Sequence, residues 1–68
     1  MNLIEGLQQE MNRVQEVITE YEAMPGGVGR LAAAIMRADI QNAERSIASG
    51  DVVEMLVSYK SLQEIESD

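Results

Sequence analysis

The apolar side chains of the first 21 residues follow a spacing that constrains the fold more than any other feature of the sequence. Six of them succeed one another at intervals of 3, 4, 3, 4 and 3 positions, with Leu3 and Val17 widening the series on one side: Ile4, Leu7, Met11, Val14, Ile18 and Tyr21. This is the a/d spacing of three heptads, which places all six side chains along one stripe of an α-helix. We therefore predict a helix over residues 3–23. Pro25 should end it, because proline disfavours helical geometry in the preceding residue.

A second helix is predicted over residues 28–48, after the glycine-rich segment Pro25–Arg30. Its apolar residues form two strips rotated from one another, with alanines between them: Val28, Leu31 and Ile35, then Met36, Ile40, Ala43 and Ile47. A helix that is apolar over so much of its circumference is expected to contact more than one neighbour.

A third helix is predicted over residues 52–65, directly after the segment Ser49–Asp51. Gly50 can adopt the left-handed conformation that closes one helix, and Asp51 can cap the next. The side chains predicted to face inward are Val52, Met55, Leu56, Tyr59 and Leu62. A connection this short predicts an antiparallel helical hairpin. The chain is therefore expected to be all-α, a single helical domain over residues 1–68, with a long N-terminal helix and a C-terminal hairpin.

The shortness of the chain and its lack of Cys and His limit how it can be stabilised and what it can do. A domain of 68 residues buries only about 60% of the surface that its unfolded chain exposes. Small domains therefore gain stability from disulfides, a metal or a partner chain. Without Cys or His, a zinc or copper site is disfavoured, and the usual catalytic bases and nucleophiles are missing. We expect no enzyme, no catalytic residue, no metal and no cofactor, but a homo-oligomer.

The heptad stripe of the first helix, called the seam below, has two alternative partners. It can pack on the other two helices of the same chain, or it can pair with the seam of a second chain, since symmetric dimers are the commonest oligomers. In the second case, the oligomer interface would consist of Ile4, Leu7, Met11, Val14, Ile18 and Tyr21.

The acidic charge balance argues against several partners. The net charge is −7, from 12 acidic and 5 basic residues, whereas nucleic-acid binders usually present a basic surface to the phosphates. Anionic membranes are disfavoured for the same reason. The longest apolar run, Leu31–Met36, is far too short to span a bilayer, and Met1–Glu5 lacks the basic start of a secretion signal. We expect neither direct nucleic-acid binding nor membrane binding, and a cytoplasmic location.

The glycine-rich segment is the one candidate ligand site. Gly26, Gly27 and Gly29 precede a helix whose free amides can hold a phosphate or a carboxylate. Arg30 adds a guanidinium in the first turn, where the helix dipole would favour an acid, and Arg37 lies nearly two turns further on. The alternative is a flexible connection whose arginines form ion pairs, because glycine clusters often occur without a ligand.

Three stretches of the sequence form a recognisable pattern. They are Met1–Gly6; Pro25–Arg30 with Ile35, Asp39, Ile40, Ala43 and Glu44; and Ile47–Leu56 with Tyr59 and Leu62. Together they resemble small acidic helical proteins encoded by tailed bacteriophages and prophages, over nearly the whole chain. The resemblance implies an accessory role in the host cytoplasm, such as counter-defence, by covering a protein surface or by sequestering a nucleotide signal.

The sequence therefore predicts a non-enzymatic, phage-type accessory protein that binds a host or phage protein. The first alternative is an oligomer that sequesters an anionic nucleotide at the segment from Gly26 to Arg30, with Tyr21 or Tyr59 as the only aromatic side chains for stacking. The second alternative is a structural or assembly component.

Overall fold

The computed structural model describes residues 2–67, which form three α-helices and one short 3₁₀ turn. α1 spans Leu3–Glu22, α2 spans Arg30–Ser49 and α3 spans Val52–Gln63, and the turn η1 at Pro25–Gly27 lies between α1 and α2. No strand occurs in this described range, so the predicted all-α fold class is confirmed there. Nor does any helix within it have both the length and the apolar character needed to cross a bilayer.

Local signals at the helix ends explain why the helices begin and end where they do. The Asn2 side chain accepts a 2.8 Å hydrogen bond from the Glu5 amide at the start of α1. Asp51 caps α3 in the same way, accepting from the Glu54 amide at 3.1 Å. Gly50 closes α2 in the left-handed conformation, with φ of 69°, which glycine adopts without steric cost. The caps predicted at Gly50 and Asp51 are therefore confirmed.

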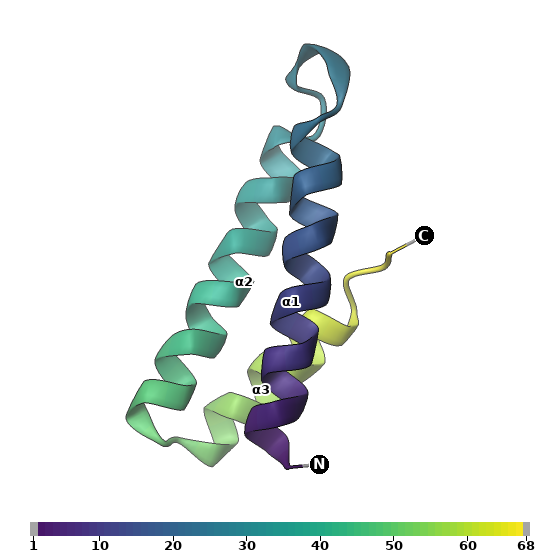
Figure 1. The fold of residues 1–68 in the computed structure, drawn as a ribbon. Helices are drawn as coiled ribbons and strands as arrows, with labels where there is room; N and C mark the ends of the chain where they lie inside the picture. The colour runs from purple at the N-terminus through teal and green to yellow at the C-terminus, as the bar shows by residue number, and fades with distance from the viewer. Residues whose placement is uncertain (1, 68) are drawn as a thin grey trace.

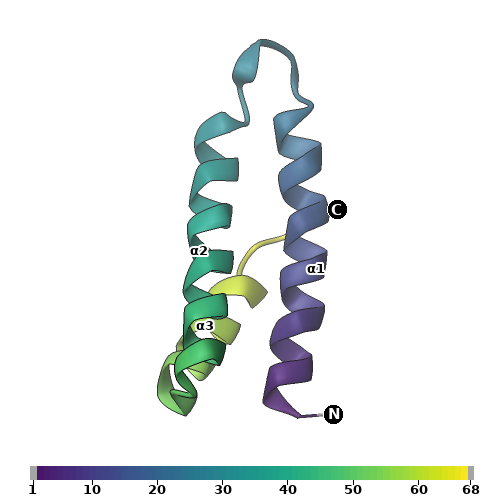
Figure 2. The same cartoon turned by 60° about the vertical axis from the view of Figure 1, so that its left-hand side comes forward.

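The three helices form an elongated bundle in which α3 covers only one half of the α1–α2 pair. α1 and α2 lie side by side and run in opposite directions along most of their length (Figures 1 and 2). After Gly50, α3 turns back and packs across the half of this pair that lies away from η1 (Figure 1). The half next to η1 therefore has two helices instead of three. The radius of gyration, 12.3 Å, exceeds the value of about 11 Å typical of a compact chain of this length.

The core lies between the three helices and contains side chains from each of them. Its buried apolar members are Leu7, Val14, Val17, Ile18, Ala33, Met36, Ala43, Met55 and Leu62. Small side chains on α2 let the helices approach closely, since Ala33 and Ala43 are almost completely buried. Two serines, Ser46 on α2 and Ser58 on α3, are also buried where these helices meet.

The seam of α1 packs inside the chain. Leu7, Val14 and Ile18 are fully buried, so α2 and α3 of the same chain already cover them. Met11 and Tyr21 are partly buried against the same core, and Ile4 is 41% exposed. The intramolecular alternative therefore describes the seam in this fold, and its fully buried positions present no surface to a second chain.

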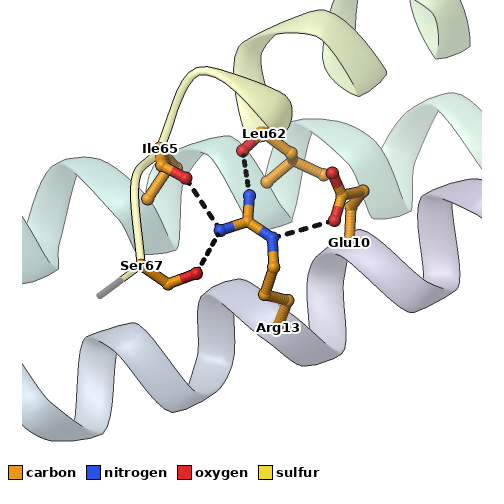
Figure 3. A network of polar contacts seen from close by, with 5 residues as sticks. All are labelled: Glu10, Arg13, Leu62, Ile65 and Ser67. Carbon is orange, nitrogen blue, oxygen red and sulfur yellow. Dashed lines mark hydrogen bonds and ion pairs between the residues drawn. The ribbon is translucent and has the colours of Figure 1, made fainter.

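Arg13 of α1 fixes the C-terminal end of α3 (Figure 3). Its guanidinium donates to the carbonyl oxygens of Leu62 and Ile65, both at 2.8 Å, and to the Ser67 hydroxyl at 3.0 Å. The Arg13 Nε also donates to the Glu10 carboxylate at 2.9 Å. The last carbonyls of a helix have no partner inside the helix, so this one side chain both satisfies the end of α3 and holds it against α1.

Candidate functional site

Two glycines of the glycine-rich segment Pro25–Arg30, the candidate anion-binding loop, are needed for the reversal of the chain between α1 and α2. Gly26 and Gly27 have φ of 71° and 70°, in the left-handed region that residues with a side chain rarely adopt. They let the backbone turn through η1 between the end of α1 at Glu22 and the start of α2 at Arg30. Their presence is therefore explained by backbone geometry.

The third glycine of the loop, Gly29, is needed because two backbones approach closely. It is buried beside the last turn of α1. A Cβ at this position would overlap the carbonyl oxygen of Tyr21 and lie only 2.8 Å from its carbonyl carbon. Gly29 therefore lets the start of α2 pack directly on the end of α1, a structural role that needs no ligand.

The two arginines of the predicted site have different surroundings. Arg37 forms an ion pair with Glu22, which joins the middle of α2 to the end of α1. Arg30 is exposed in the first turn of α2, with its aliphatic stem next to Gly27. Within residues 2–67, Arg30 forms no ion pair. The guanidinium of Arg30 is therefore without an ion-pair partner among residues 2–67, whereas the guanidinium of Arg37 is paired with the Glu22 carboxylate.

The two tyrosines are committed to packing. Tyr21 and Tyr59 are each partly buried against the hydrophobic core, Tyr21 in the last turn of α1 and Tyr59 on α3. Most of each ring is thereby used inside the molecule.

A shallow groove of about 430 Å³ runs between α2 and α3. All of its lining residues except Val57 are polar or charged by type: Asp39, Asn42, Arg45, Ser46 and Ser49 from α2, and Glu54, Val57, Ser58 and Ser61 from α3. In the described part of the chain, no three carboxylates gather closely enough to hold a metal ion. The groove thus offers hydrogen-bonding and charged groups from both helices.

The most distinctive surface features are large apolar side chains that α2 and α3 leave exposed. We call Val28, Leu31 and Ile35 the α2 strip; these residues are 80%, 75% and 57% exposed. Val28 was predicted to begin this helix, but α2 begins at Arg30, so Val28 lies just before it. We call Val52, Val53, Leu56 and Val57 the α3 outer face; its members are 54–68% exposed. The strip was visible in the sequence as a pattern, but nothing in the sequence showed that it would stay uncovered.

The inward orientation predicted for Val52 and Leu56 is wrong. Both are more than half exposed, whereas Met55 and Leu62 are buried and Tyr59 is partly buried. The residues of α3 are apolar on both sides of the helix, so hydrophobicity alone could not select the inward side. The repeated pairs Val52-Val53 and Leu56-Val57, one turn apart, were the available signal that a second apolar side exists.

Comparison with protein-family models, curated proteins and solved structures gave no match to this chain. The fold and its surfaces define the class: a small three-helix protein with two separate exposed apolar surfaces. What these surfaces bind must be inferred from their own chemistry.

Proposed function

We propose that this chain is a non-enzymatic, phage-type accessory protein that acts as a homo-oligomer and binds another protein of the host or phage. The observation that supports binding best is the α2 strip, which exposes three large apolar side chains at and just before the start of one helix. Leu31 and Ile35 are one turn apart on α2, the spacing by which a helix presents anchors to an apolar groove, and Val28 precedes the helix at the end of η1.

The position of the α2 strip suits docking. Leu31 and Ile35 belong to the N-terminal half of α2, and Val28 lies just before it; α3 does not cover this half of the α1–α2 pair (Figure 2). The exposed alanines Ala34 and Ala38 lie on the same helix and would let a partner approach closely. At the observed exposures, burying the three anchors is worth roughly 3–6 kcal/mol before the costs of association are subtracted.

The charge of the molecule indicates the kind of partner. A net charge of −7 favours a partner whose apolar groove has a basic rim, because such a rim accelerates encounter and disfavours wrong partners. Association with such a partner should slow as salt is added, since salt screens charges at the rim of an interface.

Quantitative affinity capture from the native host tests this proposal. Leu31→Glu should abolish capture of the partner, because the new carboxylate would have to be buried in an apolar groove. Gln41→Glu is the matched control, since it adds the same charge to an exposed position on the same helix. A protein retained by the wild type and by Gln41→Glu but lost with Leu31→Glu is the expected result. Equal capture by both variants would contradict the role of the strip.

Sequestration of an anionic nucleotide is the second candidate, and the uncommitted guanidinium of Arg30 is the observation that favours it. A single phosphate held at a helix N-terminus binds weakly, with a Kd of roughly 1 mM and hence a binding free energy of about −4 kcal/mol. Calorimetric titration with nucleotides and cyclic dinucleotides tests it. Submillimolar binding that Arg30→Glu removes while helicity is retained would support this candidate, and the lack of any such binding would contradict it.

A further inference from the structure

α3 carries apolar side chains on more than one side, and its own chain buries only one set of them. Met55 and Leu62 pack into the core, whereas the α3 outer face exposes Val52, Val53, Leu56 and Val57. A helix that is apolar beyond the stripe covered by its own chain is expected to contact more than one neighbour. With only 12 residues, α3 is also short enough to depend on packing for its stability. The outer face is therefore a surface without its partner.

The area of the α3 outer face indicates the strength of the contact that it can make. One Val or Leu side chain contributes on the order of 100 Å² of apolar surface. At exposures of 54–68%, the four side chains give roughly 240 Å² per copy. Since interfaces are about 57% apolar, this corresponds to roughly 400 Å² per partner, or about 800 Å² in total. Complexes below about 1,200 Å² are weak and dissociate readily.

The charges around the α3 outer face suit a second copy of the same chain. None of its four residues is acidic, although the chain carries 12 carboxylate side chains. One turn beyond the face lies Lys60, and the start of α3 is acidic, with Asp51 as its N-cap and Glu54 in its first turn. If two α3 helices pair in antiparallel orientation, Lys60 of each copy lies alongside the acidic first turn of the other. This arrangement reduces the repulsion between two chains that each carry a charge of −7.

We propose that the α3 outer face binds a second copy of this chain, forming a symmetric dimer in which two α3 helices pair in antiparallel orientation. This inference rests on the homo-oligomer part of the proposed function, and it assigns that role to α3 instead of the α1 seam. The partner protein keeps a separate surface, the α2 strip. The dimer is weak, so its population depends on concentration.

Sedimentation equilibrium over a range of concentrations tests the dimer. The wild-type mass should rise with concentration from 7.5 kDa toward twice that value. Leu56→Glu should weaken association at least tenfold, with unchanged helicity because Leu56 is exposed. Leu31→Glu is the control: it introduces the same change on the other apolar surface and should associate like the wild type. A wild-type monomer up to millimolar concentration would overturn the proposal, as would equal association of the two variants.

Cysteine cross-linking provides a second measurement that does not depend on a charged variant. The chain contains no Cys, so a single introduced thiol reports on one position. Near the two-fold axis, Val57→Cys should lie close to its own copy and form a disulfide-linked dimer with added oxidised glutathione. Leu31→Cys should cross-link at least tenfold more slowly. Equal cross-linking rates would refute the α3 interface, even if the chain proved to be dimeric.

The same variants separate this inference from the proposed partner binding. Leu56→Glu should still capture the partner protein, and Leu31→Glu should still dimerise. Loss of dimerisation in Leu31→Glu, with dimerisation kept in Leu56→Glu, would move the self-association surface to α2 and overturn the assignment to α3.

Discussion

Gly29 suggests a ligand-binding loop in the sequence, but in the structure it allows two helix backbones to pack closely. It belongs to the glycine cluster that predicted an anion site, yet its missing side chain lets α2 begin directly against the last turn of α1. The atom that a side chain would meet is a backbone atom of Tyr21, which cannot move aside in the way that a flexible side chain can. The glycine at this position is therefore fixed by the helix pairing.

Gly29→Ala should destabilise the fold by about 1–3 kcal/mol, the range observed when an extra carbon is forced into a packed site. The measurement is the midpoint of thermal or urea unfolding followed by circular dichroism. Val28→Ala is the matched control, because the neighbouring side chain is 80% exposed and its truncation should change the midpoint little. An unchanged midpoint for Gly29→Ala would show that the ends of α1 and α2 do not meet as described.

The element that depends most on distant contacts is α3. Its first residues are fixed locally by the Asp51 cap, but its last turn is fixed by Arg13, which lies 49 positions earlier in the chain than Leu62. Because α3 offers apolar residues on both sides, the bonds from Arg13 help to select which side faces the core. The orientation of α3 thus reflects the bundle as a whole.

Arg13→Met should loosen α3 while leaving α1 and α2 paired. The substitution keeps an apolar stem but leaves the carbonyls of Leu62 and Ile65 without their charged donor, at a cost of about 1–3 kcal/mol. Hydrogen exchange should therefore speed up in the last turn of α3 more than in the middle of α1. Arg45→Met is the control, since Arg45 is exposed and bonds only to Asn42 within residues 2–67. Equal protection of α3 in the wild type and Arg13→Met would contradict this role.

Local signals made the helices predictable, whereas the pairing of side chains across the bundle was not predictable. Gly50 and Asp51 act on their immediate neighbours, so the boundary between α2 and α3 could be read from the sequence. The ion pair of Arg37 with Glu22 joins residues 15 positions apart on different helices, and no local pattern marks it. The choice between the two apolar sides of α3 was undetermined for the same reason, since it depends on how three helices fit together.

At the scale of the whole molecule, the small core implies a low free energy of unfolding. Among residues 2–67, nine apolar side chains are buried, and two of them are alanines. A domain of 68 residues has a free energy of unfolding of roughly 3–10 kcal/mol. Removing one central contact can therefore unfold the entire chain.

Ile18→Glu should unfold the protein, because Ile18 is fully buried in the core between the helices. A carboxylate there would lose the apolar contacts and remain without a partner, and the combined cost of several kcal/mol approaches the whole stability. Circular dichroism and the dispersion of amide proton resonances should both show loss of the fold. Ile18→Val is the control, expected to cost only about 0.5–1.5 kcal/mol. A folded Ile18→Glu chain that merely dissociates would instead place the α1 seam at an interface between chains, and the single-chain packing of this core would then be wrong.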